Sequence, residues 1–342
     1  MKSRRTMNVP VLALLGILAA LAVGTVARDA GATAPGENGR IAFRRYFDKD
    51  HTAGAIFVMA PDGTGSRQVT RPPRGFLDQN ADWSPNGSLI VFQRCADTIP
   101  CAVFTVKSDG TRLKRLSWAP GKGGRLLSDE DDQAPTFTSD GRHVVFTRAS
   151  GGLHPKVDQI KHSDLVVMDL SGNNRRIVLR APQYKADYEN ASFSPDGSKL
   201  VYEHRRSQLV DPQTRRALVV SSADGKRQQR ITPWSLNAGD GADWSPDGTR
   251  ILFRSYEDDN ERTQSQLYTI RPDGTELQQL TKFPDGTVLL SASFSPDGQQ
   301  IVFGMGGKGG KADIFVMNAD GTEIRPLLQH AAWDSSVDWG SG

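Results

Sequence analysis

The sequence predicts an all-β fold, a six-bladed β-propeller with four antiparallel strands in each blade. Three observations predict it. A five-residue turn phrase recurs about every fifty residues, a second glycine turn alternates with it, and one further copy of the first phrase is divided between the chain ends. Repeats of this length are typical of modular β architectures.

The first phrase is an aromatic residue followed by Ser-Pro, or a close equivalent, and by Asp-Gly or Asn-Gly. Ser-Pro starts a turn, and glycine takes a positive φ at little cost. An apolar run follows at a fixed offset, as at Ile90 and Phe92, so each copy predicts a hairpin. The complete copies are 83–87, 137–141, 193–197, 244–248 and 294–298.

The second phrase is an apolar strand that ends in another glycine turn, which is Asp-Gly in five of six copies. A short polar stretch follows and closes on an apolar residue, as at Val69, which predicts a fourth strand. Two hairpins per repeat make one four-stranded blade. The copies are 56–63, 103–110, 165–172, 218–225, 267–274 and 314–321.

The divided copy predicts how the propeller closes. Residues 336–340 supply the aromatic strand, and residues 37–43 supply the turn and the next strand. We therefore expect the C-terminal strand to pair with N-terminal strands in blade 1, which leaves no free blade edge.

The aromatic-Ser-Pro-Asp-Gly turn, the Ile-x-Phe strand and the Asp-Gly-Thr turn resemble the WD-repeat-like blade signature of the TolB-like β-propeller family. The resemblance covers residues 36–340. It departs at Asn86, Thr138-Ser139, Ser171 and Glu37-Asn38, and Asn and Ser are accepted turn formers.

Periplasmic TolB, part of the Tol–Pal system, also has an α/β domain before its propeller, whereas about forty residues precede blade 1 here. The partner-binding role that the resemblance implies is therefore not carried over intact. Some relatives are propellers of serine peptidases, but no Gly-x-Ser-x-Gly motif follows blade 6, so we expect no peptidase activity.

Residues 1–32 have the pattern of a signal peptide, and residues 33–342 form the propeller domain. Lys2, Arg4 and Arg5 precede an apolar stretch at 9–26, and cleavage is expected after Ala32, with Ala27 as the alternative site. Both the general secretory and the twin-arginine routes fit the basic residues. We expect a periplasmic or extracellular protein; an uncleaved membrane anchor is the alternative.

Charge does not indicate a nucleic-acid partner. The chain has 42 basic and 39 acidic residues, and removing residues 1–32 leaves 38 of each. The apparent basicity thus belongs to the signal segment. We expect a monomer with no membrane span in the mature chain.

Cys95 and Cys101 are the two cysteines of the chain and occupy facing ends of a hairpin loop. In an oxidising compartment this spacing predicts a disulfide. Closing so short a loop stabilises the fold by roughly 2 kcal/mol. A redox role would favour Cys-x-x-Cys, and a zinc site would need two more ligands.

The residue before each blade's inner aromatic has a side-chain oxygen in all six repeats. One interpretation is that these residues surround the central channel and hold water, a cation or a polar ligand. The other is that they hydrogen-bond to neighbouring backbone. They are Asp82, Thr136, Ser192, Asp243, Ser293 and Asp338.

Two further clusters lie in predicted loops of the face opposite the glycine turns. The acidic run at 129–132, with Asp48 and Asp50, fits a calcium site less well than a solvated loop. His51, His154 and His162 resemble the metal-binding histidines of propeller lyases similar to this family, whereas His143 and His204 occupy strand positions.

The sequence supports two functional hypotheses. The favoured one is an exported, non-catalytic binding module of an envelope or transport complex, which presents its loops and channel mouth to a protein, peptide or cell-envelope glycan. It needs no cofactor, although a divalent cation in the channel is compatible with it. The alternative is a metal-assisted polysaccharide lyase or hydrolase that uses the channel.

Overall fold

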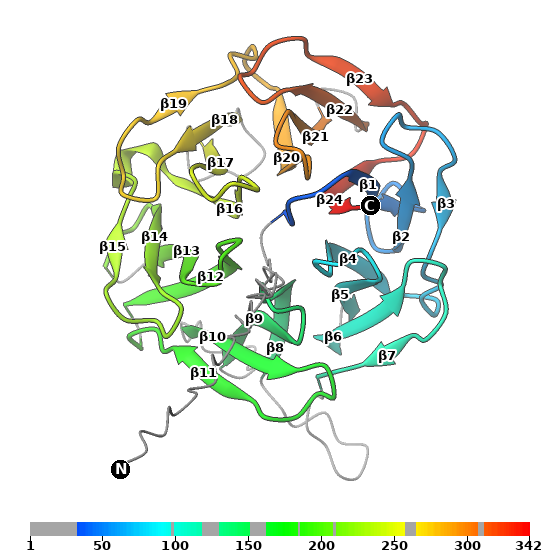
Figure 1. Ribbon diagram of the computed structural model, residues 1–342. Helices are drawn as coiled ribbons and strands as arrows, with labels where there is room; N and C mark the ends of the chain where they lie inside the picture. Colours follow the sequence, from blue (N-terminus) through cyan, green and yellow to red (C-terminus); the bar gives the residue numbers. More distant parts are fainter. Residues whose placement is uncertain are drawn as a thin grey trace, which may run out of the picture.

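The computed structural model describes residues 33–96, 99–117, 130–150, 162–183, 185–207, 210–256, 265–306 and 311–342. These residues form β-strands and turns, with one short 3-10 helix, η1 (Trp234–Leu236). The sheets stand around a central axis like the blades of a propeller (Figure 1). None of the helical structure in the described ranges is long and apolar enough to cross a membrane.

Four sheets have four antiparallel strands each, and their strands follow chain order from the central channel to the rim (Figure 1). The fourth strands are short because each only covers the rim of its sheet. The strands are β8 (Asp131–Phe137), β9 (His143–Ser150), β10 (His162–Asp169) and β11 (Arg176–Leu179); β12 (Ala186–Phe193), β13 (Lys199–Arg206), β14 (Arg216–Ser222) and β15 (Gln229–Arg230); β16 (Ala238–Trp244), β17 (Ile251–Tyr256), β18 (Ser265–Ile270) and β19 (Gln278–Gln279); and β20 (Val288–Phe294), β21 (Gln300–Gly306), β22 (Ala312–Asn318) and β23 (Arg325–Leu328).

A fifth sheet has eight strands and divides into two groups of four, joined by one parallel pairing at Gly54 and Leu77. One group is β4 (Leu77–Trp83), β5 (Leu89–Ala96), β6 (Ile99–Lys107) and β7 (Lys114–Arg115). The other is β24 (Asp334–Ser341), β1 (Asn38–Tyr46), β2 (Gly54–Met59) and β3 (Arg67–Gln68).

The two ends of the described chain meet in this second group. β24 pairs antiparallel with β1, so that Ile41 is opposite Trp339 and Arg45 is opposite Asp334. Trp339 Nε1 also donates to the carbonyl of Gly39 at 3.2 Å. Figure 1 shows red β24 beside blue β1, in the innermost position of the group.

Each repeated turn forms a local hydrogen-bond network. In 193–197, Ser194 Oγ donates to Asp196 Oδ1 at 2.6 Å, and the same carboxylate oxygen accepts the N–H of Ser198 at 3.0 Å. Ser194 Oγ accepts the N–H of Lys199 at 3.0 Å. Asn86 replaces the aspartate in its own turn and accepts from Ser88 in the same way. The repeated phrase therefore serves the hairpin geometry.

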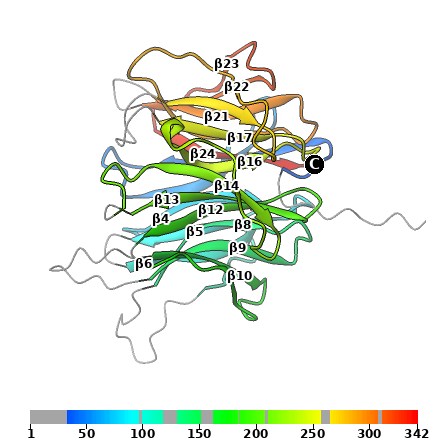
Figure 2. The same cartoon turned by 90° about the vertical axis from the view of Figure 1, so that its left-hand side faces the viewer.

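The glycine turns lie together on one face, which we call the turn face; we call the opposite face the loop face. Ser341, near the C-terminus, donates to the carbonyl of Pro85 in a glycine turn at 2.7 Å, so the C-terminus lies at the turn face. Figure 2 shows the sheets from the side, with the C-terminus at that face.

The hydrophobic cores lie between neighbouring sheets. Val91 and Val103 of one sheet pack with Phe137, Val144 and Phe146 of the next. The same arrangement joins the first and last sheets in the sequence, because Ile41, Phe43 and Trp339 pack with Val302 and Ile314. Burial of these aromatic and branched side chains supplies the main favourable free energy of the fold.

Five of the innermost strands contain a left-handed residue two positions before the aspartate, serine or threonine that was predicted to surround the channel. Asn80, Ala134, Asn190 and Ser336 have φ between 46° and 53°, and Gly241 has φ of 84°. The ladders shift register next to Asn80, Ala134, Asn190 and Gly241. Bulges of this kind redirect side chains and are frequent beside functional sites.

Candidate functional site: a polar channel with a charged cavity at its loop end

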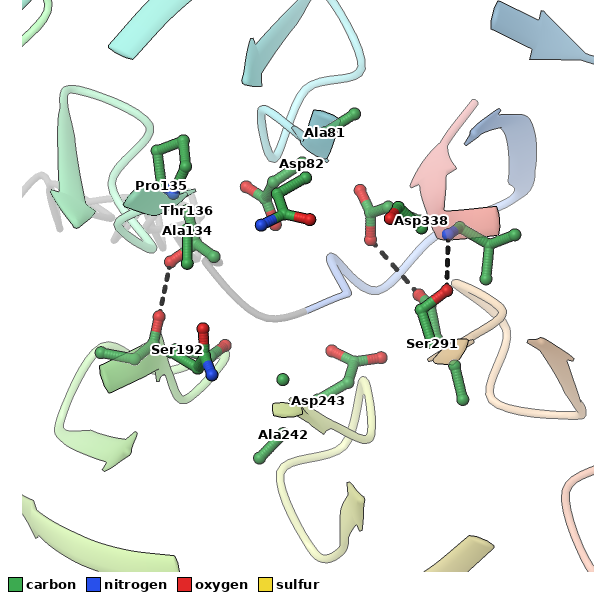
Figure 3. Close-up of a pocket in the computed structure, with 18 of the residues that line it drawn as sticks. Ala81, Asp82, Ala134, Pro135, Thr136, Ser192, Ala242, Asp243, Ser291 and Asp338 are labelled. Carbon is green, nitrogen blue, oxygen red and sulfur yellow. Dashed lines mark hydrogen bonds between the residues drawn. The ribbon is translucent and has the colours of Figure 1, made fainter. Parts of the chain in front are cut away.

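The six predicted residues all line one central channel, a cavity of about 150 Å³. They lie at matching positions on the innermost strands. Five of them are labelled in Figure 3, where they surround the central axis. We call Asp82, Thr136, Ser192, Asp243, Ser293 and Asp338 the channel ring.

The three aspartates of the ring each connect two neighbouring groups of four strands. Asp82 Oδ2 accepts the N–H of Phe137 at 2.8 Å, and Asp243 Oδ2 accepts that of Phe294 at 2.8 Å. Asp338 Oδ2 accepts the N–H of Trp83 at 2.7 Å. In each case the donor is the inner aromatic residue of the next group of four strands. These aspartates therefore line the channel and also hydrogen-bond to neighbouring backbone.

The hydroxyl residues of the ring complete similar links. Ser293 Oγ accepts the N–H of Trp339 at 3.2 Å and donates to Asp338 Oδ1 at 3.3 Å. Thr136 Oγ1 donates to the carbonyl of Ala191 at 2.8 Å. At Ser192 the link is made by the backbone, whose carbonyl accepts Trp244 Nε1 at 3.1 Å.

The three ring carboxylates hold their protons more tightly than ordinary aspartates do. Burial, and then the charge of the nearby Asp243, raise the pKa of Asp338 to about 7. Burial also raises the pKa of Asp243 to about 6, against hydrogen bonds that lower it. The pKa of Asp82 is well above its usual range because of burial and the charge of Asp338. Like charges around a narrow channel have this effect.

A second cavity of about 170 Å³ adjoins the channel ring toward the loop face and shares Asn80, Ala134 and Asn190 with the channel. Glu189 of β12 and Glu203 of β13 lie directly opposite each other in the ladder and both line it. Its remaining lining residues are Gln133, Thr147, Arg216 and Tyr256.

The glutamate pair is held by arginines. Arg205 Nη2 lies 3.1 Å from Glu189 Oε1, and Arg216 Nε lies 2.9 Å from Glu203 Oε1. Burial, and then the charge of Glu203, raise the pKa of Glu189 to about 7. Two like charges directly across a ladder destabilise a sheet, so this pair has a cost that other positions of the repeat avoid.

Equivalent ladder positions in two other sheets are neutral. Gln79 is opposite Gln93 in the β4–β5 pair, and Gln133 is opposite Thr147 in the β8–β9 pair. The acidic pair therefore breaks the internal repeat at one place on the channel wall. Sequence reasoning missed Glu189 and Glu203, although alignment of the repeats with one another contains the signal.

Sequence reasoning also missed a set of buried Asp–Arg pairs near the loop face. Arg94 Nε and Nη2 donate to Asp78 at 2.6 and 2.8 Å, and Arg94 lies over the ring of Phe104. Such bidentate pairs add geometric specificity as well as attraction. The equivalent pairs are Arg45–Asp334, Arg148–Asp132 and Arg205–Asp187.

The acidic run proposed as a solvated loop is corrected by the structure. Asp131 and Asp132 belong to β8, Asp131 accepts the N–H of Cys101 at 2.7 Å, and buried Asp132 pairs with Arg148. The alternation of strand β8 and the arginine on β9 explain this placement. Asp129 lies outside the described residues.

His51 is the one candidate histidine whose side chain the described ranges include. His51 stacks on Tyr46, whereas His204 contacts Tyr188 and Trp234. His154 lies outside the described residues, as does the side chain of His162. Within the described ranges, no three His, Cys, Asp or Glu residues are arranged to hold a metal ion. Cys95 and Cys101 form a disulfide, with Cα atoms 4.1 Å apart.

Comparisons with solved structures identify the fold. TolB from Acinetobacter baumannii superposes with a TM-score of 0.68 at 18% identity, over 90% of this chain and 68% of that one. A protein assigned as TolB from Agrobacterium tumefaciens gives 0.57 at 17%, over 86% and 90%. An oligogalacturonate lyase in complex with manganese gives 0.52 at 16%, over 85% and 79%.

No protein-family model and no curated protein matches the sequence. The structural likeness shows that the chain has a TolB-like β-propeller fold. TolB-like and lyase propellers both resemble it, so its function depends on its own channel and loops.

Proposed function

We propose that this protein is an exported, non-catalytic binding module. In this proposal residues 1–32 are removed as a signal peptide, and residues 33–342 form six blades that close into a ring through β24 and β1. The module works in the periplasm or outside the cell, as a monomer, and binds a protein, peptide or cell-envelope glycan at the loop end of its channel. The TolB-like fold and the Cys95–Cys101 disulfide support it.

The observation that supports a binding role most directly is the charged cavity at the loop end of the channel. The protein maintains opposed Glu189 and Glu203 where equivalent positions have Gln79 and Gln93. An acidic pair on the wall of a polar cavity favours a role in recognition.

The chemistry of the cavity favours a polar, uncharged or weakly basic group as ligand. The amides of Asn80, Gln133 and Asn190 offer both donors and acceptors, whereas Arg205 and Arg216 already offset the charge of the glutamates. A peptide backbone or a pair of sugar hydroxyls matches such a surface. The channel ring below it would receive a narrow side chain or a terminal group.

Site-specific photo-crosslinking in the native envelope tests the proposal. A photoreactive residue at Gln133, on the cavity wall, is expected to give a discrete adduct. The matched control is the same residue at Lys226, which is exposed in a glycine turn on the opposite face. Adding Glu189→Gln together with Glu203→Gln to the Gln133 chain should reduce adduct formation about tenfold, the effect of losing roughly 1.4 kcal/mol of binding free energy.

Two results would contradict this proposal. Equal crosslinking at Gln133 and Lys226 would mean that the loop end has no special affinity. Undiminished crosslinking in the double-glutamine variant would exclude the glutamate pair from recognition.

The lyase hypothesis stays a separate prediction with its own test. It requires a divalent ion bound by histidines of the loop face. Metal analysis of the purified protein, followed by His154→Ala and His162→Ala, checks it. A stoichiometric ion that is lost in those variants would replace the non-catalytic proposal, whereas no bound ion in the intact protein would eliminate the lyase.

A further inference from the structure

The first described residues of the chain are buried in the turn-face end of the channel. Thr33 and Ala34 are buried, and Thr33 Oγ1 donates to Asp243 Oδ2 at 3.0 Å. The same hydroxyl lies 3.4 Å from Ser293 Oγ, and the backbone N–H of Thr33 is also hydrogen-bonded to Asp243. In Figure 3 the blue ribbon of these residues passes between Asp243 and Asp338.

The segment is fixed at this position by a second contact. The N–H of Gly36 donates to the carbonyl of Pro296, in the glycine turn after β20, at 3.1 Å. Thr33 and Ala34, together with Asp82 and Asp338, line the small cavity at this end. The start of the segment therefore lies among all three ring carboxylates.

The ring carboxylates have no basic side chain beside them on the channel wall. Among the described residues that line the channel and its turn-face end, the charged ones are Asp82, Asp243 and Asp338 alone. Three carboxylates without a cation is an electrostatically unfavourable arrangement, since buried charges are normally paired.

We propose that the missing cation is the α-ammonium group of Thr33, created when the signal peptide is removed. Hydrolysis of the Ala32–Thr33 peptide bond consumes one water molecule and leaves a carboxylate on Ala32 and an amine on Thr33, which takes up a proton. The new ammonium then lies where the peptide N–H of Thr33 now meets Asp243 and acts as a counter-ion to the ring. This inference rests on the export part of the proposed function.

The raised pKa of the Thr33 α-ammonium would make the stability of the processed protein depend on pH. An ordinary α-ammonium has a pKa of about 7.7–8.0, and three nearby carboxylates raise it in the folded state. The stability that the ion pair contributes is complete below that ordinary pKa and is lost as the pH rises through the raised folded-state pKa. Processing thus adds one positive charge to a ring of three carboxylates and reduces their repulsion.

The test begins with the protein purified from the envelope of an exporting cell. N-terminal sequencing is expected to give Thr-Ala-Pro, from residues 33–35. Competitive trace labelling of the amine, measured by mass spectrometry of the N-terminal peptide, then gives its pKa and reactivity. We expect a pKa at least about one unit above the ordinary α-amino range, and slower labelling than in the unfolded chain.

Asp243→Asn provides the decisive variant, because asparagine keeps an oxygen to accept the Phe294 N–H but removes the charge. It should lower the amine pKa toward its ordinary range, because Asp82 and Asp338 remain. Asp247→Asn is the matched control, since Asp247 lies in the glycine turn of the same β16–β17 hairpin and accepts locally from Ser245. It should leave the amine pKa unchanged.

Three outcomes would overturn the inference. A processed protein that starts elsewhere, for example at Arg28, would exclude the ion pair while leaving the export proposal intact. A Thr33 amine with an ordinary pKa that Asp243→Asn does not change would do the same. A chain that retains Met1 would contradict export itself and with it the ion pair.

Discussion

The aspartates of the glycine turns and the aspartates of the channel ring differ in the direction of their pKa shifts. In the turns, hydrogen bonds from Ser171 and from the N–H of Asn173 lower the pKa of Asp169 to about 2. In the ring, burial and like charge raise the pKa of Asp338 to about 7. The same residue type therefore serves opposite purposes at the turn face and on the axis.

The difference shows which aspartates belong to the fold and which to the site. A turn carboxylate is surrounded by donors from its own five or six residues, so every repeat can build it independently. A ring carboxylate depends on residues from another group of four strands, 51 to 255 positions away in the sequence. Local sequence determines the first group, and assembly determines the second.

Removing β24, the innermost strand that contributes Asp338, should lower thermal stability more than the substitutions that follow. Deletion of residues 333–342 eliminates β24, including buried Val337 and Trp339. Loss of one large buried aromatic alone costs about 3–5 kcal/mol, so we expect no cooperative thermal transition above room temperature. Deletion of Gly342 alone is the control. A truncated chain that melts like the intact protein would disprove closure through β24.

The second-largest loss of stability is expected at Asp78, an inner-strand carboxylate that pairs with Arg94. Asp78→Ala leaves Arg94 buried without its bidentate partner and should lower the free energy of unfolding by about 3–5 kcal/mol. Combining it with Arg94→Met should recover most of that loss in urea denaturation. If the double variant is as unstable as the single one, packing rather than charge pairing explains the effect.

The channel ring itself should respond to pH. In the 342-residue chain, where Thr33 keeps its peptide bond, the folded-state pKa of Asp338 is about 7 and the unfolded one about 4. The folded state therefore binds the extra proton in this window, and stability falls as the pH rises from 4 to 7.

The asparagine side chain of Asp338→Asn does not titrate. The free energy of unfolding of this variant, relative to that of the parent chain, should therefore increase by about 1–3 kcal/mol between pH 4 and pH 8. Chemical denaturation across that range measures the difference. A constant difference at all pH values would show that Asp338 titrates normally.

The turn aspartates should change stability the least, and their contribution should increase rather than decrease as the pH rises. Because the folded-state pKa of Asp169 is lowered, its contribution is present at neutral pH and is lost as the pH falls through about 2. Asp169→Asn should lower Tm slightly at pH 7 and leave it unchanged at pH 2. A larger effect at low pH than at neutral pH would reverse the contrast drawn between turn and ring.

Much of the architecture was predictable because it repeats. The glycine turns placed the hairpins, and the fixed offset from each inner aromatic placed all six ring residues on one channel. The partners of those residues were not predictable, because the donor to Asp82 is the backbone of Phe137 in another sheet. The repeat predicts where such a residue lies on its strand but not which residue of another strand it contacts.

The loop-end cavity shows the same limit. Arg205 and Glu189 belong to adjacent strands, and neither repeated phrase indicates that they form a pair. Asp131 and Asp132 were misplaced because a run of acidic residues suggests exposure, whereas an arginine opposite makes burial possible. The order of charged residues along a chain does not show which acidic residue is paired with an arginine on the adjacent strand.

The pairing of β24 with β1 has a consequence for the timing of folding. Gly39 and Trp339, which meet in that pair, are 300 residues apart. Synthesis at about 5–20 residues per second leaves the apolar edge of β1 without its partner for roughly 15–60 s. Such distant contacts also make the final step slow. Until the last strand is released, the unpaired edge of β1 is therefore open to pairing with other chains.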